Sequence, residues 1–414
     1  MTITQQELAC RLREARESSG LTQDDVARDL DLSRPSIAQI ELGNRTVSSL
    51  ELDRLSHLYG RDIRDFLASE FRPEDSVMAL FRAGAGAPSQ EILSAVRDCA
   101  ALAREMANLE SLLGLDRSQV GVPLYPVAMP RTKWQAIEQG SQTAADERRR
   151  LGLGSGPLGD VVDLLESQGV RTATVDLPED VSGLTLMQPG LSLLVVANRR
   201  HSFLRRRFSW VHEYAHVLLD RSRRGTLSRL SDREELSEVR ANAFAAAFLL
   251  PEEGVRVFLA GLGKGQPARE RQDVFDGEGS VAAESRLEAS TQKVQLYDVV
   301  LLADHFGVSR TTALYRLRNL QLLKQEELDR LLAEDQAGRG KSVARFLGLP
   351  EPDRAERDEF RSRFLSLSLE ACRREKISLG KLRELAAQVG AGHLLEEAGL
   401  DDGEEEILLP DGIE

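Results

Sequence analysis

One segment of five residues, His212-Glu213-Tyr214-Ala215-His216, constrains this chain more than any other. In a helix, at about 100° per residue, the two histidines lie only about 40° apart on one face. Both imidazoles can therefore reach a single metal ion, and Glu213 lies beside any water bound to that ion. The spacing predicts a helix that carries a metal-binding pair, and the competing interpretation is two surface histidines.

The segment has the residue types that zinc-dependent peptide hydrolysis requires. A catalytic Zn²⁺ takes three protein ligands and leaves its fourth position to a water whose pKa it lowers. Glu213 would accept the proton of that water and later donate it to the leaving amine as a general acid. A third ligand must then come from another part of the chain.

A second helix, predicted over residues 238–251, can supply that ligand. Glu238 leads this helix, and Pro251 closes it. Glu234 and Glu235 are alternatives to Glu238, but the charged stretch around them favours exposure to water. The face that begins at Glu238 continues with small residues that would let this helix approach the histidine helix closely: Ala241, Asn242 and Ala245.

These two segments resemble the ImmA/IrrE-type metallopeptidases. Residues 207–213 match the family's lead into H-E-x-x-H, with Ser209 where the family often has Thr, and residues 238–251 match its Glu-x-x-Ala-Asn-x-Phe-Ala helix. A weaker resemblance covers residues 126–255 and places a turn at residues 181–185. The resemblance implies a zincin-like α+β domain, an endopeptidase activity and a DNA-binding repressor as the usual target. It also implies the site residues: His212, His216 and Glu238 as zinc ligands and Glu213 as the catalytic base.

The sequence does not decide two features of this region, the residue that stabilises the oxyanion and the position of one strand in the sheet. No residue that would stabilise the oxyanion is evident, because Tyr214 lies between the ligands and is expected to point away, and His201 is an unsupported alternative. The apolar run from Leu191 to Ala197 predicts a buried strand. That strand is either interior or an edge to which a peptide substrate could add.

The other strong pattern lies near the N-terminus, where residues 21–43 read as helix, tight turn and helix. Thr22 and Asp25 form a capping-box pattern, Ser33 can cap the second helix, and Ser48 with Glu51 repeats the pattern for a third. The outward positions of the second helix carry side chains that can reach base edges or phosphates: Arg34, Ser36 and Gln39.

Residues 5–67 resemble the Cro/repressor helix-turn-helix of the XRE type. The resemblance implies contact with double-stranded DNA, with Gln23 on a phosphate and Arg45 on the backbone, and with Arg34, Ser36 and Gln39 facing the major groove. Residues 1–70 hold 9 Lys and Arg against 13 Asp and Glu, a net charge of −4. Any DNA affinity must therefore come from a local basic face or from a homodimer, and a helical protein-interaction module is the alternative.

The apolar runs and the cysteines of the sequence indicate in which cellular compartment the protein works. No apolar run approaches the roughly 18 residues of a membrane helix, and the N-terminus lacks a secretion signal. Three scattered cysteines fit neither a disulfide framework nor a cysteine zinc site. We therefore expect a cytoplasmic protein without a membrane partner.

The remaining segments suggest a division of the 414 residues into five parts. We expect a DNA-binding domain (1–70), a helical linker (71–125), the peptidase domain (126–255), a mobile loop near 261–280 followed by a helix-turn-helix-like pair (256–335), and a helical C-terminal region with an acidic tail (336–414). The fold class is thus multidomain and mainly α, with one α+β domain. Structural packing is favoured over DNA binding for the later helix pair, in which Arg310, Thr311 and Arg316 are the candidate contacts.

Arginines flank the metal motif on both sides. They predict either a basic rim for an acidic substrate or, with more weight, ion pairs with nearby carboxylates from Asp220 to Glu238. The sequence as a whole predicts a DNA-binding regulator joined to a zinc endopeptidase that cleaves a repressor or a toxin-related regulator. The alternative is a non-enzymatic transcription factor or antitoxin-like protein that uses the peptidase fold to sense a signal or bind a partner.

Overall fold

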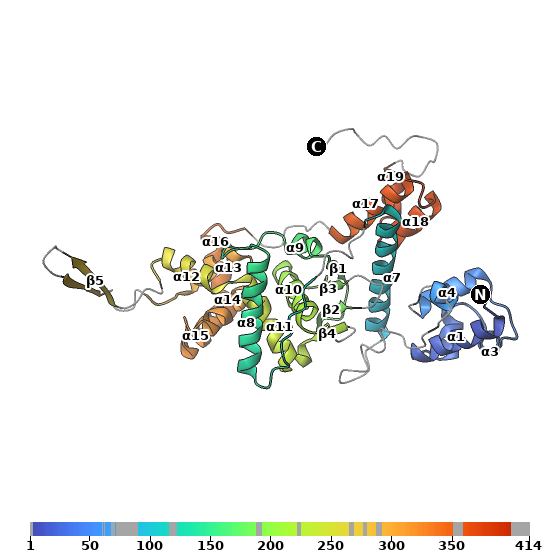
Figure 1. Cartoon of the computed structure of the whole chain (residues 1–414), viewed down its shortest axis with the longest axis horizontal. Coiled ribbons are helices and arrows are strands. Elements are labelled where there is room, and N and C mark those ends of the chain that lie inside the picture. The colour runs from blue at the N-terminus through green and yellow to red at the C-terminus, as the bar shows by residue number, and fades with distance from the viewer. Residues whose placement is uncertain are drawn as a thin grey trace.

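The structure is a computed structural model of the whole chain. It describes residues 3–59, 61, 63–67, 71, 90–115, 122–187, 193–221, 225–264, 269–275, 280–286, 292–350 and 359–398. These residues are mainly helical, with one four-stranded mixed sheet and a separate two-stranded hairpin. Figure 1 shows the N-terminal helices as a group of their own, and the larger body gathered around the sheet.

Among the residues described up to Leu67, the N-terminal group has five helices: α1 (Gln5–Ser18), α2 (Gln23–Asp29), α3 (Arg34–Glu41), α4 (Ser49–Leu58) and α5 (Ile63–Leu67). The predicted caps all form. Thr22 with Asp25 and Ser48 with Glu51 make capping boxes, and the Ser33 side chain accepts a hydrogen bond from the Ser36 backbone. The helices close around a small apolar core that includes Val26, Leu30, Ile37, Ile40 and Tyr59.

The central sheet has the strand order β1-β3-β2-β4. Its strands are β1 (Arg171–Val175), β2 (Val181–Leu186), β3 (Leu194–Asn198) and β4 (Gly225–Arg229). Strand β1 runs parallel to β3, whereas β2 is antiparallel to both β3 and β4. One expectation is corrected here, because residues 181–185 belong to a strand rather than a turn. Of the two alternatives for β3, the structure shows the interior strand, which cannot offer an edge to a peptide.

Alternation along β3 explains its uniformly apolar sequence. Val195 and Ala197 pack into a core shared with helix α10 (Phe203–Leu219), whereas Leu194 and Val196 pack into a second core on the opposite face. A strand that is covered on both faces needs apolar residues at every position. The histidine helix α10 is thus one of two helical layers that enclose the sheet.

The layer that contains α10 is extended by further helices: α8 (Lys133–Arg150), α9 (Val161–Ser167), α11 (Leu236–Leu249), α12 (Glu252–Gly261), α13 (Leu296–Phe306), α14 (Arg310–Asn319), α15 (Gln325–Gln336) and α16 (Arg339–Phe346). Helices α8 and α11 are in close contact because Gly140 lies directly against the backbone of α11. A Cβ at Gly140 would overlap the Arg240 carbonyl oxygen. Phe244, Phe248 and Leu249 of α11 are buried in the same core.

The opposite layer joins two segments far apart in the sequence, α7 (Gln90–Leu113) and α17 (Glu359–Arg373). Met106 and Leu109 of α7 and Phe364 and Leu367 of α17 pack with the second face of the sheet (Figure 1). Helices α18 (Leu379–Gln388) and α19 (Gly392–Glu397) follow α17. The helix expected to be a linker is therefore part of the body that contains the sheet.

The segment expected to be a mobile loop contains regular structure. Strands β5 (Arg269–Phe275) and β6 (Ser280–Arg286) pair antiparallel in a hairpin that leads away from the body (Figure 1). Residues 265–268 and 276–279 lie outside the described residues, as does the acidic tail from residue 399 onward.

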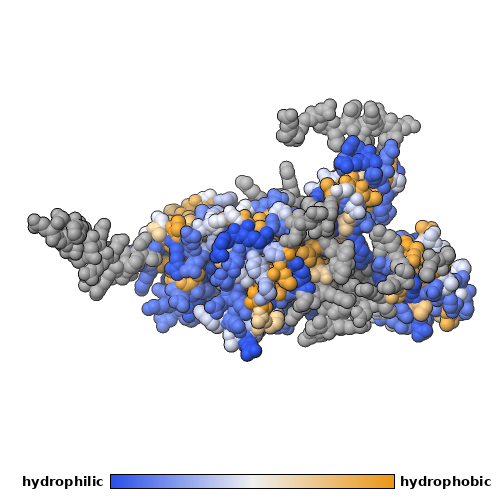
Figure 2. Space-filling model, in the orientation of Figure 1, coloured by the Kyte–Doolittle hydropathy of each residue, from blue (hydrophilic) through white to orange (hydrophobic). Residues whose placement is uncertain are grey.

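The surface is predominantly polar. Figure 2 shows hydrophilic residues over most of the side formed by α8 and α12–α16, with apolar residues in small groups. Among the helices that the structure describes, none is both long enough and apolar enough to cross a bilayer.

Candidate metal centre

Helix α10 is buried from Ser209 to its end, between the sheet on one side and α11 on the other. Its position follows from its sequence, because Val211, Val217 and Leu218 supply apolar contacts around the polar pair His212 and His216. Helix α11 crosses nearby and begins two residues before Glu238, so that the acidic side chain in its first turn reaches the two histidines.

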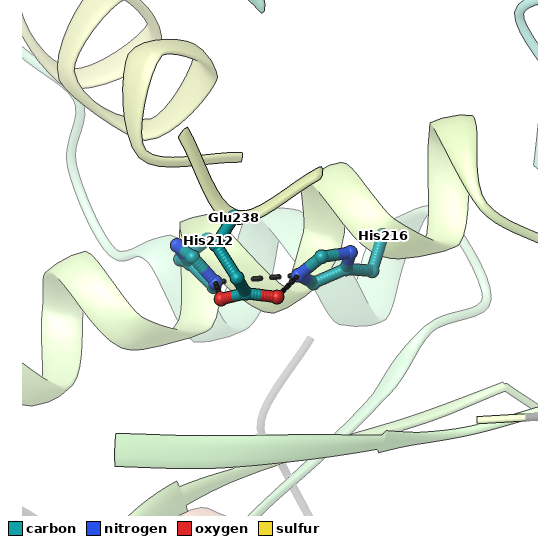
Figure 3. Close-up of side chains that lie close together, drawn as sticks. All are labelled: His212, His216 and Glu238. Atoms are coloured by element: carbon teal, nitrogen blue, oxygen red, sulfur yellow. Dashed lines mark hydrogen bonds and ion pairs between the residues drawn. The ribbon is translucent and has the colours of Figure 1, made fainter. Parts of the chain in front are cut away.

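The three predicted ligands meet at one point (Figure 3). His212 Nε2 lies 3.1 Å from one Glu238 oxygen, His216 Nε2 lies 3.2 Å from the other, and the two Nε2 atoms are 3.3 Å apart. In a tetrahedral zinc site with bonds of roughly 2.0–2.1 Å, neighbouring ligand atoms are about 3.3 Å apart. The spacing of the donors therefore fits a tetrahedral ion, and the donor set of two imidazoles and one carboxylate is one that zinc accepts.

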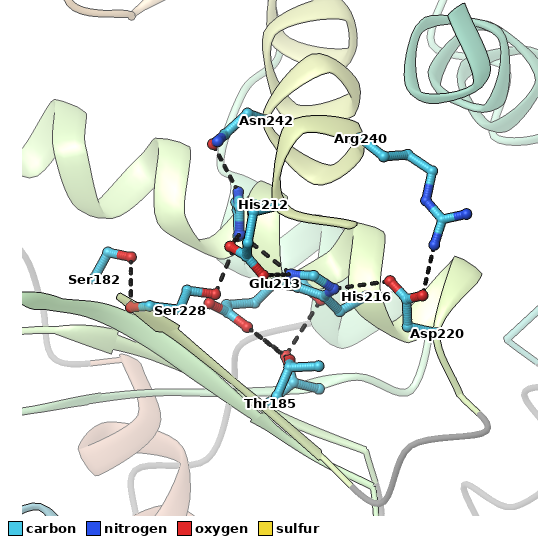
Figure 4. Close-up of polar contacts among 11 residues, drawn as sticks. Ser182, Thr185, His212, Glu213, His216, Asp220, Ser228, Arg240 and Asn242 are labelled. Carbon is cyan, nitrogen blue, oxygen red and sulfur yellow. Dashed lines mark hydrogen bonds and ion pairs between the residues drawn. The ribbon is translucent and has the colours of Figure 1, made fainter. Parts of the chain in front are cut away.

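Further side chains fix the orientation of both imidazoles (Figure 4). His212 Nδ1 donates to Asn242 Oδ1 at 2.9 Å, and His216 Nδ1 donates to Asp220 Oδ2 at 2.9 Å. Arg240 in turn donates to Asp220 Oδ1 at 2.6 Å. Because each Nδ1 carries the proton, each Nε2 lone pair faces the point where the donors meet.

The electrostatics of the cluster favour positive charge. Burial alone would lower the pKa of His216, but hydrogen bonds to Asp220 and Glu238 outweigh burial and raise that pKa to about 10. Burial would raise the pKa of Glu238, but hydrogen bonds from His212 and His216 hold it well below its usual value. The negative charges that stabilise a proton here would stabilise a cation in the same way.

Glu213 lies beside the donors and is fully buried. One of its oxygens accepts a hydrogen bond from Thr185 Oγ1 at 2.7 Å and lies 3.5 Å from Thr226 Oγ1, as Figure 4 shows for Thr185. Its other oxygen, Oε1, has no hydrogen-bond partner among the described residues. A buried carboxylate oxygen without a donor is costly unless another group, such as a water, meets it.

Gly183 makes room for this carboxylate. A Cβ at Gly183 would lie 2.6 Å from the Val196 carbonyl oxygen and 3.0 Å from Glu213 Oε1. The small residue on β2 therefore keeps open the space that Glu213 occupies.

The structure separates the other candidates from this cluster. Glu234 and Glu235 are exposed, and Glu234 pairs with Lys133 of α8. Tyr214 points away, as expected, and donates to Glu147 at 2.5 Å in the core. His201 precedes α10 and contacts the Glu179 carbonyl oxygen.

Several residues around the ligands were not predicted from the sequence to belong to the site. Asp220 follows His216 by four residues and Asn242 follows Glu238 by four, so helical periodicity could have suggested both. Thr185 and Ser228 come from strands, and no spacing in the sequence indicates that their side chains meet α10.

Two of the arginines near α10, Arg207 and Arg221, donate to main-chain oxygens rather than to the predicted carboxylates. Arg207 is buried and donates to the carbonyl oxygens of Leu158 and Gly159. Arg221 donates to the carbonyl oxygens of Val122, Pro123 and Val217. The expected partner Asp220 binds Arg240 instead, so these arginines join loops to the body through main-chain oxygens. Arg223 and Arg224 lie outside the described residues.

The predicted DNA-contacting residues all belong to the N-terminal helices. Arg34 and Gln39 are exposed on α3, and Ser36 is half-buried. Gln23 donates to the buried Glu41 at 2.8 Å, and Arg45 donates to Glu51 at 2.5 Å. Arg34 and Gln39 are thus presented to solvent, although Gln39 accepts from Asn44 at 3.0 Å and Arg34 lies 3.7 Å from Asp24.

The later helix pair, α13 and α14, is structural in its packing. Arg316 is buried and donates to the Leu250 carbonyl oxygen at 2.9 Å, and Arg310 donates to Asp335 at 2.5 Å. Leu314 and Leu317 join the core that contains α10. The favoured interpretation of this pair thus agrees with its contacts.

Two segments of the chain match models of known protein families. Residues 7–67 match a helix-turn-helix domain, and residues 165–266 match an IrrE N-terminal-like domain, which is a peptidase family. The second match includes α10, α11 and all three donors. No curated protein matches the chain.

Proposed function

Because this chain joins an XRE-like helix-turn-helix domain to an IrrE N-terminal-like domain of a peptidase family, we propose that it is a DNA-binding regulator with zinc-dependent endopeptidase activity. Its substrate is a repressor or related regulatory protein, and its N-terminal domain binds an operator in double-stranded DNA. The observation that carries the proposal is the donor cluster, in which the two Nε2 atoms lie 3.3 Å apart and each lies 3.1–3.2 Å from one oxygen of Glu238, beside the unpartnered Oε1 of Glu213.

His212, His216 and Glu238 would hold the zinc, which when bound supplies a Lewis acid that lowers the pKa of a coordinated water. Thr185 holds one oxygen of Glu213 and leaves Oε1 to accept the proton of that water. The same oxygen then donates the proton to the leaving amine. Asn242 and Asp220 keep both imidazoles in the tautomer that binds a cation through Nε2.

Metal content and cleavage can be tested separately. Elemental analysis of zinc-replete protein should find about one zinc per chain, lost in His212→Ala and kept in Glu213→Gln. Profiling of protein N-termini in cells that carry the wild type or Glu213→Gln should then reveal at least one new N-terminus that requires Glu213. Equal profiles from two equally zinc-loaded proteins would refute the peptidase activity.

Burial of the site favours a second candidate, a non-enzymatic regulator that uses the peptidase fold to sense or to bind a partner. Glu213 and His216 are 0% exposed, His212 is 5% exposed and Glu238 is 7% exposed. An extended peptide reaches these atoms only after a covering segment moves. If Glu213→Gln retains full control of transcription in cells while His212→Ala loses it, the bound metal serves regulation rather than hydrolysis.

A further inference from the structure

Ser228 is a polar side chain at the metal centre to which neither domain match assigns a role. It lies on β4, is 2% exposed, and pairs in register with Gly183 of β2. Its Oγ lies 3.2 Å from His212 Nε2, and Figure 4 shows this hydroxyl between the sheet and the histidine. This is its one hydrogen bond in the described part of the chain.

The distance to His212 Nε2 identifies what the hydroxyl faces. His212 Nδ1 donates to Asn242, so Nε2 is the nitrogen that faces the donor cluster. The separation of 3.2 Å between Ser228 Oγ and this nitrogen is close to the 3.1–3.3 Å that separate the two Nε2 atoms from each other and each from one oxygen of Glu238. In a tetrahedral site about 3.3 Å separates each pair of vertices, so Ser228 adjoins the vertex that three ligands leave open.

We propose that the Ser228 hydroxyl borders the open coordination position and donates a hydrogen bond to the oxygen that binds there. With zinc bound, that position would accept an oxygen ligand, either a water or the carbonyl oxygen of a substrate, and Ser228 would donate to whichever oxygen is there. Ser228 thereby supplies the donor that the sequence does not reveal. The inference rests on the proposed metal site, and the experiments below separate the two.

The neighbouring hydroxyl on β4 has a different contact. Thr226 lies two residues before Ser228, on the same face of the strand. Its Oγ1 approaches Glu213 Oε2 at 3.5 Å. Strand β4 thus directs one hydroxyl to the base and one to the ligands. In the described sheet β4 is an end strand and pairs with β2, so a shift of β4 disturbs the pairing with one neighbour rather than two.

Substitution of Ser228 by cysteine tests the placement directly. Cobalt(II) in place of zinc gives a near-ultraviolet charge-transfer band when a thiolate binds it, independent of any cleavage. Ser228→Cys loaded with one equivalent of cobalt(II) should show this band, because a sulfur beside the open position can bind the metal there once no other ligand occupies it. Ser182→Cys is the matched control: its hydroxyl donates to the main-chain oxygen of Ser228, so its sulfur should stay unbound.

The outcomes distinguish the inference from the proposal beneath it. A wild-type protein that binds cobalt(II) through His212 and His216, together with a Ser228→Cys variant without the thiolate band, would overturn the placement of Ser228 alone. Failure of the wild type to bind one equivalent, or binding that survives His216→Ala, would instead remove the metal site itself.

A second measurement tests the hydrogen bond. Acetohydroxamate, a small chelator that supplies oxygen ligands, can be titrated into the cobalt(II) protein and followed by visible absorption. Loss of a hydrogen bond to a charged oxygen should weaken its binding roughly 10-fold or more in Ser228→Ala. Ser228→Thr keeps the hydroxyl and should restore most of the affinity. Equal affinity in the wild type and Ser228→Ala would show that the hydroxyl makes no such bond.

Discussion

Asp220 and His216 are joined by a hydrogen bond of 2.9 Å, one turn apart on the chain and at the end of α10. Arg240 of α11 occupies the other oxygen of the same carboxylate. The orientation of one candidate ligand therefore depends on a contact between the two helices that supply all three ligands.

Asp220→Asn is expected to weaken zinc binding about 10- to 100-fold, because an amide neither balances the Arg240 charge nor orients the imidazole as firmly. Competition with a chromophoric chelator would measure the change. The half-buried Asp232, which is not part of the donor cluster, provides the control in Asp232→Asn, which should bind as the wild type does. An unchanged affinity in Asp220→Asn would mean that α10 alone fixes the ring.

Asn242→Ala should have a similar effect on His212, since it removes the acceptor of the Nδ1 proton. We expect roughly a 10-fold loss of zinc affinity. Asn242→Asp keeps an acceptor at that position and should retain tight binding. A loss of similar size in both variants would point to disturbed packing of α11 rather than to the lost acceptor.

Gly183→Ala is expected to destabilise the sheet by about 1–3 kcal/mol, because the added methyl group meets a main-chain oxygen and the Glu213 carboxylate. Denaturant unfolding would measure this change in the free energy of unfolding. Gly156→Ala, where the new Cβ meets no atom within 4 Å, is the control. If the two variants are equally stable, β2 has more freedom to move than its contacts indicate.

Sequence spacing identified the parts of the site that lie within helices. His212, Glu213 and His216 follow from a pattern of one helical turn, and Glu238 follows from its place at the start of a second helix. The strand contributions could not be predicted, because Thr185 reaches Glu213 from 28 residues away and only the pairing of β2 with β4 brings Ser228 to His212.

The mainly helical fold class was predicted correctly. The interior place of β3 and the packing of α7 against α17 depend on contacts across long stretches of chain, which local patterns do not encode. The proposed domain boundaries remain predictions.

A buried ion pair between Glu110 and Arg171 connects α7 to β1. Arg363 of α17 lies 3.5 Å from the same glutamate and also pairs with Glu166. Glu110→Gln should therefore cost about 3–5 kcal/mol in the free energy of unfolding, because a buried guanidinium loses its counter-charge. Chemical denaturation would measure it. The exposed pair between Lys133 and Glu234 is the matched control, and Glu234→Gln should cost less than about 1 kcal/mol.

The N-terminal domain offers the last test, which concerns DNA recognition by α3. Arg34 and Gln39 are exposed on the second helix of the predicted pair, so the readout of bases should depend on these two side chains. Duplexes selected from a random pool by the full chain would define the preferred site. On that site, Gln39→Ala should lose about 1–3 kcal/mol of binding free energy and relax the preference for one base pair. Arg34→Ala should also reduce the salt dependence of DNA binding if its guanidinium contacts a phosphate.

Arg28 is exposed on α2, and Arg28→Ala controls for the general effect of charge on DNA binding. Because the domain carries a net charge of −4, a uniform weakening by all three variants would show that binding is electrostatic and that α3 does not read the sequence.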